Sequence, residues 1–223
     1  MLEAHVGKET MVLDVGCGDG TTMKHLGGNC VGIDISIEAL RFAKANSEAD
    51  VVVGSALALP FREESFDVIV CTEVLEHLGE MEIAIEHLAA LLKPEGIVHF
   101  TVPLASWYRL FLFRFLGIRP YYLSEDEHKR EFSAIPVERF DSISSLISMI
   151  ENHGLRIEEM EGSYFFPDRI EGPLDKIVND SARMREFAKR LDNILDKIPR
   201  LSSFGRYLAL SCRKAEEPQT KSS

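Results

Sequence analysis

The amino-acid sequence predicts an α/β protein whose first half forms a parallel sheet. Short runs rich in β-branched residues alternate there with helix-like runs, which is typical of βαβ units. A glycine-rich turn joins the first of these strands to the segment that follows it. The chain has 223 residues, of which 45% are hydrophobic, so we expect a single folded domain over residues 1–223 that needs no disulfide or structural metal.

Five strands and three helices are expected in the first half. The last of these helices has apolar residues at three- and four-residue spacing, such as Leu88, Leu91 and Leu92, which give it one buried face. Residues 93–96 then form a turn, because Pro94 ends the helix and Gly96 opens the next strand. The expected strands are residues 11–15, 30–34, 50–53, 66–71 and 96–102, and the expected helices are residues 21–26, 36–46 and 80–92.

The second half continues with longer elements. Gly154 is expected to end one helix, and Pro199 to end another. The expected elements are a helix at residues 137–153, a strand at 155–162, a long amphipathic helix at 174–198, a final strand at 206–212 and a disordered tail at 214–223.

The composition limits the class of protein. The 25 basic and 36 acidic side chains give a net charge of −11, and an acidic chain without a basic tail disfavours nucleic-acid binding. No apolar run is long enough to cross a bilayer and no signal-peptide core is present, so we expect a cytoplasmic protein. The four cysteines, Cys17, Cys30, Cys71 and Cys212, form no C-x-x-C pair, which favours reduced thiols over a disulfide framework.

A glycine-rich loop follows the first expected strand in the segment Asp14-Val15-Gly16-Cys17-Gly18-Asp19-Gly20. Glycines there let the chain turn sharply and let a ligand lie against the main chain, where a Cβ atom would collide. Asp34 ends the second strand, and a carboxylate at that place in a βαβ unit accepts hydrogen bonds from both hydroxyls of a ribose. The pattern therefore predicts a nucleoside site.

The spacing distinguishes between two nucleoside cofactors. A nicotinamide dinucleotide site uses G-x-G-x-x-G, but counting from Gly16 and Gly18 puts the last glycine position on Thr21. Asp14 would also repel a pyrophosphate, whereas it suits a ligand that has an ammonium group and no phosphate. S-adenosylmethionine is such a ligand. The alternative is a glycine-rich turn that binds nothing.

Four further blocks follow the glycine loop and Asp34 in order. They are Gly54-Ser55-Ala56-Leu57-Ala58-Leu59-Pro60-Phe61, Ser65-Phe66-Asp67-Val68-Ile69-Val70, Glu73-Val74-Leu75-Glu76-His77-Leu78 and Leu91-Leu92-Lys93-Pro94-Glu95-Gly96. With these blocks, residues 11–103 resemble a class I S-adenosylmethionine-dependent methyltransferase of the type 11 group, which includes the ubiquinone- and menaquinone-biosynthesis methyltransferases. The resemblance implies a Rossmann-like, mostly parallel seven-stranded sheet in the order 3-2-1-4-5-7-6, with an antiparallel last strand, helices on both faces and an inserted helical lid.

The resemblance also implies cofactor contacts by position. In the family, the loop with Asp14 holds the methionine moiety, Asp34 the ribose, and Ser55 with Ala56 the adenine. The family usually has Asp at the position of Ser55, and a serine hydroxyl is a weaker, uncharged acceptor, so a modest cofactor affinity is expected. The implied cofactor-binding set is Asp14, Gly16, Cys17, Gly18, Asp34, Ile35, Ser55, Ala56, Leu57 and Thr72.

Two histidines are candidate catalytic residues. His77 lies just past the fourth expected strand, where ligands bind in such sheets, and is a candidate base or acceptor-orienting group. Alternatively, it is a helix-start residue that hydrogen-bonds to Glu76 or to the backbone. Glu73, Glu76 and His77, with His128 from a later segment, also resemble the metal ligands of small-RNA 2′-O-methyltransferases. Our expected site contains no metal, and His128 stays the second catalytic candidate.

Residues 103–140 occupy the position where the family places its substrate cover. Aromatic side chains crowd residues 104–122, and three arginines recur there every five residues. A helix turns about 500° over five residues, so these arginines do not share one face. Three interpretations stay open: a lid over a hydrophobic acceptor, a peripheral contact of residues 104–122 with a membrane or lipid, and a dimer contact or plain core packing.

The sequence therefore predicts an S-adenosylmethionine-dependent methyltransferase, a monomer or homodimer, that acts on a small or lipid-like acceptor, most simply at oxygen. Two alternatives remain. One is a non-catalytic S-adenosylmethionine-binding module with a regulatory or assembly role. The other is a metal-dependent RNA 2′-O-methyltransferase.

Overall fold

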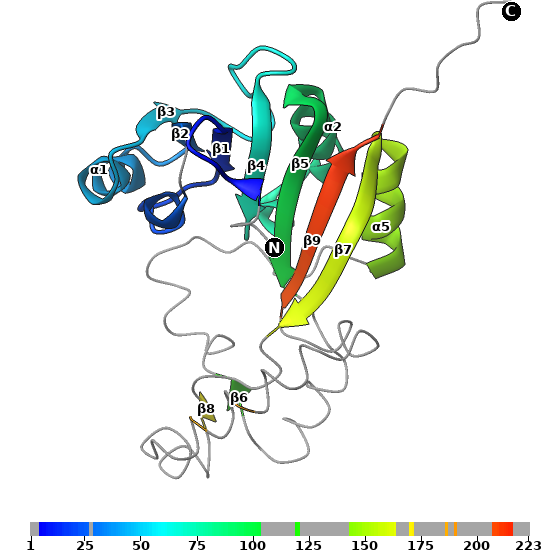
Figure 1. Cartoon of the computed structure of the whole chain (residues 1–223). Coiled ribbons are helices and arrows are strands. Elements are labelled where there is room, and N and C mark those ends of the chain that lie inside the picture. Colours follow the sequence, from blue (N-terminus) through cyan, green and yellow to red (C-terminus); the bar gives the residue numbers. More distant parts are fainter. Residues whose placement is uncertain are drawn as a thin grey trace, which may run out of the picture. The chain divides into compact units, whose positions relative to one another are not determined.

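A computed structural model of the chain describes residues 5–26, 29–103, 119–120, 143–163, 170–171, 186, 190 and 207–215 (Figure 1). The chain divides into two compact units. The first holds Met1–Val102, Phe140–Glu159 and Leu210–Ser223, and the second holds Pro103–Arg139 and Met160–Ala209. The candidate site lies in the first unit.

Seven strands form one sheet: β1 (Met11–Val15), β2 (Asn29–Asp34), β3 (Asp50–Val53), β4 (Phe66–Thr72), β5 (Leu92–Pro103), β7 (Leu155–Ser163) and β9 (Tyr207–Lys214). Their order is β3-β2-β1-β4-β5-β9-β7. Because β7 and β9 are the sixth and seventh strands of this sheet along the chain, the predicted order 3-2-1-4-5-7-6 is confirmed. The pairs from β3 to β5 are parallel, and β9 (red) runs opposite to β7 (yellow) in Figure 1.

Helices cover both faces of the sheet. The elements described in full include the helices α1 (Ile37–Asn46), α2 (Met81–Leu91) and α5 (Ile143–Asn152) and the short 3₁₀ helices η2 (Met23–His25) and η3 (Leu75–His77). α1 begins after Ser36, whose Oγ accepts the N–H of Ala39 at 3.2 Å. Leu40 of α1 belongs to a buried cluster against which Cys30 packs, and Cys30 lies on the face of β2 that also bears Asp34. In contrast, α2 and α5 lie behind β5, β9 and β7 in Figure 1.

The turn expected directly after Leu92 is a bulge inside β5. Leu92 pairs with Phe66 of β4, and registered pairing resumes only at Ile97. Lys93 holds the bulge in place, because its Nζ donates to both carboxylate oxygens of Asp67, at 2.9 and 2.8 Å. The strand therefore starts earlier than predicted.

Most other boundaries agree with the prediction. β1 and β3 have the predicted bounds, and the predicted glycine stop of α5 is confirmed, since Gly154 has a φ of +74°. The helix expected at residues 21–26 was too long, because only η2 forms there. The tail was expected from Lys214, but this residue belongs to β9, and its Nζ donates to the carbonyl of Leu92 at 2.8 Å.

Several predictions fall outside the described residues. They include the helical lid apart from residues 119–120, the helix at 174–198 apart from Glu186 and Arg190, the tail beyond residue 215, and His128. Within the second unit, β6 (Arg119–Pro120) pairs antiparallel with β8 (Ile170–Glu171). None of the helices that the structure describes has the length and apolar character needed to span a bilayer.

Candidate functional site

Hydrogen bonds attach the loop after β1 to the end of β2. The N–H of Cys17 donates to the carbonyl of Ile33 at 3.1 Å. The N–H of Gly18 donates to Oδ2 of Asp34 at 2.9 Å, and Oδ1 of Asp34 accepts the N–H of Ser36 at 2.8 Å. Each carboxylate oxygen can accept a further hydrogen bond. Asp34 can therefore hold the loop and still accept two hydroxyl groups.

Two glycines of this loop have different surroundings. Gly20 has a φ of +81°, and a Cβ atom there would lie 2.9 Å from Cα of Ala43 in α1, so this glycine is needed for packing. Gly18 has a φ of +53°, and a Cβ atom there would meet no described atom within 4 Å. The space beside Gly18 is therefore open to a ligand that lies against the main chain.

Asp14 is a buried carboxyl group directly before this loop. It is 2% exposed, and its Oδ2 has no hydrogen-bond partner among the described residues. Burial raises the pKa of Asp14 from 3.8 to about 7, and the nearby charge of Asp34 adds to the rise. A buried carboxylate without a counter-charge costs free energy, so a cation bound beside Asp14 would relieve this cost.

The segment after β3 begins beside the end of β2. Ser55 Oγ accepts the N–H of Leu57 at 3.1 Å, which leaves one acceptor position on this hydroxyl. Ala56 is buried, whereas Ile35, next to Asp34, is 76% exposed. Such an exposed apolar side chain beside the Asp34 carboxylate could lie against a flat base.

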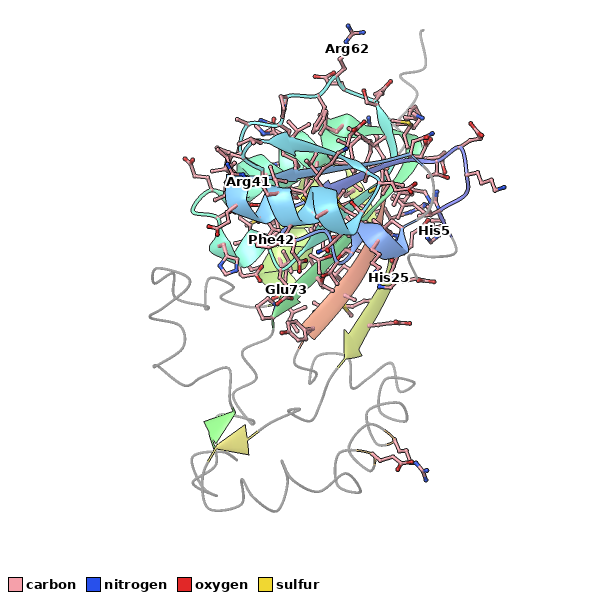
Figure 2. All side chains as sticks on the ribbon, turned by 90° about the vertical axis from the view of Figure 1, so that its left-hand side faces the viewer. His5, His25, Arg41, Phe42, Arg62 and Glu73 are labelled. Atoms are coloured by element: carbon pink, nitrogen blue, oxygen red, sulfur yellow. The ribbon has the colours of Figure 1, made fainter. Side chains whose placement is uncertain are left out.

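The end of β4 brings the next expected residues to the same edge of the sheet. Thr72 is the last residue of β4, and Glu73 follows with a φ of +56°, at the lower edge of the sheet in Figure 2. His77 lies in η3 with its side chain 51% exposed, and its Nε2 is 3.9 Å from Oε1 of Glu76. Glu76 is 2% exposed, and burial raises its pKa from 4.5 to about 7 against an opposing hydrogen bond from its own backbone.

The alternative metal set is divided between described and undescribed residues. Within the described ranges, no group of three or more His, Cys, Asp or Glu side chains is placed to hold a metal ion. Glu73, Glu76 and His77 therefore do not form a three-ligand group by themselves. His128, the remaining member, lies outside these ranges.

A second group of polar side chains on the sheet was not predicted from the sequence. His99 and Thr101 lie on β5 and Ser211 lies on β9, where His99 Nδ1 and Ser211 Oγ share a hydrogen bond of 2.9 Å. The available signal was the presence of polar residues inside the apolar run at 97–102. The partner could not be found in this way, because Ser211 is 112 residues away from His99 along the chain.

A mostly parallel sheet with a glycine loop between two carboxylates is an arrangement in which α/β proteins bind nucleosides. Comparison with known proteins gives the family. Residues 13–100 match a family model described as "Methyltransferase domain". The chain is 30% identical over 174 residues to the "Ubiquinone biosynthesis O-methyltransferase" of Actinobacillus pleuropneumoniae serotype 7, with 70% of each chain covered. It is 34% identical over 173 residues to the protein of that name from Paraburkholderia xenovorans, with 74% of this chain and 72% of the relative covered.

The chain therefore belongs to the class I S-adenosylmethionine-dependent methyltransferases of the type 11 group. The predicted enzyme class and the predicted cofactor, S-adenosylmethionine, are thereby confirmed. Its fold is also similar to that of a putative methyltransferase from Haloferax volcanii, solved in complex with the Trm112 methyltransferase activator. The TM-score is 0.65 at 20% identity, with 96% of this chain and 86% of that chain covered.

The residues of the site fit S-adenosylmethionine. Among the described residues, Asp14 Oδ2 is a buried acceptor without a partner, Gly18 borders open space, and both oxygens of Asp34 keep an acceptor position. Asp14 would face the cationic methionine part of the cofactor, and Asp34 would hold its ribose. The cofactor would lie against the main chain at Gly18. When bound, S-adenosylmethionine supplies a methyl group that the positive charge on sulfur activates. Ser55 fits less well, because its hydroxyl already accepts a backbone N–H.

Proposed function

We propose that the protein transfers the methyl group of S-adenosylmethionine to a hydroxyl oxygen of a small or lipid-like acceptor. The main structural support is the buried carboxyl of Asp14, which lies near Asp34 and has one oxygen without a partner in the part of the chain that the structure describes. Such a pair favours a cationic ligand without phosphate. Oxygen as the acceptor atom is supported by the two relatives named O-methyltransferases, which are 30% and 34% identical to this chain.

In this proposal, His77 accepts the proton of the acceptor hydroxyl or orients that hydroxyl. Methyl transfer from a sulfonium mainly requires alignment of the reactants and exclusion of water. A base adds deprotonation of the hydroxyl. His77 is suited to this role because its ring is accessible beside the buried carboxyl of Glu76, directly after the strand end that carries Thr72.

One observation favours a second candidate, a module that binds S-adenosylmethionine without catalysing transfer. Ser55 replaces the usual acidic residue of the family, and its hydroxyl already accepts the N–H of Leu57. The adenine would therefore be held more weakly than in relatives with a carboxylate at this position.

A transfer assay separates the two candidates. The protein is incubated with S-adenosylmethionine tritiated on its methyl group and with separate lipid, quinone and RNA fractions. Label in an alkali-stable ether of the lipid or quinone fraction supports the proposal. Binding of the cofactor by calorimetry without label in any fraction supports the non-catalytic module, and label confined to RNA contradicts the acceptor class proposed here.

A further inference from the structure

Near its carboxyl end, β5 has one apolar face and one polar face. Val98, Phe100 and Val102 are apolar residues with at most 1% exposure. His99 and Thr101 alternate with them along the strand and therefore point to the opposite face. We call His99 and Thr101 the polar pair.

The strand register places the polar pair beside residues of the cofactor site. His99 pairs with Val70 of β4, and Val70 pairs with Asp14 of β1, so the three side chains lie in one row on the same face. One step nearer the carboxyl ends, Thr101 pairs with Thr72, an expected cofactor contact. Neighbouring strands are about 4.8 Å apart. The polar pair therefore lies one strand beyond the expected contact Thr72.

Both members of the polar pair have a buried polar atom without a hydrogen-bond partner. These atoms are Nε2 of His99 and Oγ1 of Thr101, judged over the part of the chain that the structure describes. His99 is only 8% exposed. Buried polar atoms in folded proteins are almost always hydrogen-bonded, so two such atoms on one face indicate a place for a ligand.

Neighbouring residues fix the orientation of the His99 ring. Ser211 Oγ hydrogen-bonds its Nδ1 at 2.9 Å, and the ring of His5 lies against it with 5.4 Å between centroids. In Figure 2, His5 lies to the right, on the side of the sheet that faces the viewer in Figure 1 and is opposite to α2 and α5. Nε2 of His99 is thus held in a set direction, and it makes no hydrogen bond to any residue that the structure describes.

The charges around the polar pair favour a neutral ligand group. Burial lowers the pKa of His99 from 6.5 to about 4, with a contribution from His5, so this imidazole is neutral at physiological pH. The nearby Asp14 would repel an anion. Arg213, two residues beyond Ser211 on β9, is already bound to Glu158 at 2.7 Å and is directed to the amino end of β5. Apart from His5, whose charge contributes to the lowered pKa of His99, these groups offer a buried anion no counter-charge.

We propose that His99 and Thr101 bind the acceptor, through hydrogen bonds to an uncharged hydroxyl group. This inference rests on the proposed function, because it assigns the acceptor side of the same site. A hydroxyl group both donates and accepts hydrogen bonds. It can therefore satisfy Thr101 Oγ1 and either tautomer of His99, whereas a carboxylate can only accept.

The test uses three small probes: phenol, anisole, which lacks the hydroxyl hydrogen, and benzoate, which is an anion. Each probe is titrated into the full chain labelled with nitrogen-15 histidine, with and without S-adenosylhomocysteine. The ring nitrogens are followed by NMR, and a His99→Gln variant assigns the His99 signals. Thr101→Val removes the hydroxyl at nearly constant volume, and Thr101→Ser is the matched control that keeps it.

We expect phenol to shift the Nε2 signal of His99, and anisole and benzoate to bind several-fold more weakly. Thr101→Val should weaken phenol binding about three- to tenfold, as the loss of one hydrogen bond predicts, while Thr101→Ser stays near the wild type. An unchanged His99 signal at high phenol, equal binding of benzoate, or a Thr101→Val variant equal to wild type would overturn the inference. Failure to bind S-adenosylhomocysteine instead contradicts the proposed function, and the titration without it still tests the polar pair.

Discussion

The backbone N–H of Gly18 donates a hydrogen bond of 2.9 Å to Oδ2 of Asp34. This bond joins the loop after β1 to the last residue of β2. The other oxygen, Oδ1, accepts the N–H of Ser36, which caps α1. Asp34 therefore joins the loop to the start of the next helix, and we propose that the remaining acceptor positions of this carboxylate bind the ribose of the cofactor.

Replacing Asp34 with Asn should sharply weaken cofactor binding. The amide keeps one acceptor oxygen, but its NH₂ group cannot accept from a hydroxyl or from a backbone N–H. Loss of one or two charge-assisted hydrogen bonds, about 1.5–3 kcal/mol each, predicts that the dissociation constant for S-adenosylmethionine, measured by calorimetry, increases at least tenfold. Asp50→Asn is the control, because Asp50 is exposed and pairs with Lys44 away from the loop. Equal loss in both variants would show that the effect is not specific to this site.

The two loop glycines should respond differently to alanine. At Gly20 the added Cβ would lie 2.9 Å from the backbone of Ala43, so Gly20→Ala should lower the melting temperature by several degrees. At Gly18 the added Cβ enters open space, so Gly18→Ala should cost only the strain of a positive φ, about 1 kcal/mol, but should block the cofactor. Thermal unfolding and calorimetry of both variants check this. A Gly18→Ala variant with unchanged affinity would remove Gly18 from the contact set.

Cofactor binding should release a proton from Asp14. With a pKa of about 7, this carboxyl is mostly protonated at pH 6, and a cationic ligand favours its ionised form. Calorimetry at pH 6 in buffers of different ionisation enthalpy should show about one proton released by the wild type and none by Asp14→Asn. Equal proton release by both proteins would assign the proton to another group.

The same raised pKa makes a prediction for stability without ligand. Because the folded protein holds the Asp14 proton up to about pH 7 and the unfolded chain releases it near pH 3.8, stability falls as the pH rises through this window. Asp14→Asn lacks this loss. Between pH 5 and pH 8 the free energy of unfolding of Asp14→Asn, measured with urea, should therefore rise by up to about 3 kcal/mol relative to that of the wild type. A constant difference between the two proteins across this range would contradict the assigned pKa.

His77→Ala should leave the cofactor affinity unchanged and lower turnover about 100-fold, the usual effect of losing a general base. The control is His25→Ala, because His25 lies in η2 and is exposed. Turnover is measured by tritium transfer to the acceptor fraction that the wild type labels. If His77→Ala turns over as fast as the wild type, His77 has no catalytic role and is a structural residue of η3.

The fold was largely predictable from local patterns. β1 and β3 have the predicted bounds, because each is a short apolar run between polar or glycine residues. The early start of β5 was not predictable in this way, since Pro94 and Gly96 indicate a turn. At the bulge, Lys93 forms an ion pair with Asp67, a contact between distant segments.

The same division holds for the candidate site. Asp14 and Asp34 could be identified from the sequence because each lies at a characteristic number of residues from the glycine loop. The sequence does not show that Asp14 Oδ2 has no partner among the described residues, or that His99 hydrogen-bonds to Ser211 on the neighbouring strand. Both facts depend on the packing of segments that are far apart in sequence, and a single sequence does not encode them in a short pattern.

The most direct test of the account is a calorimetric titration of the purified wild-type chain with S-adenosylmethionine and, separately, with NADH. At pH 8, where Asp14 is mostly ionised, Asp14 and Asp34 predict saturable binding of one S-adenosylmethionine per chain and no binding of NADH, whose pyrophosphate an ionised Asp14 would repel. Binding of NADH with no heat from S-adenosylmethionine at millimolar concentration would contradict the account.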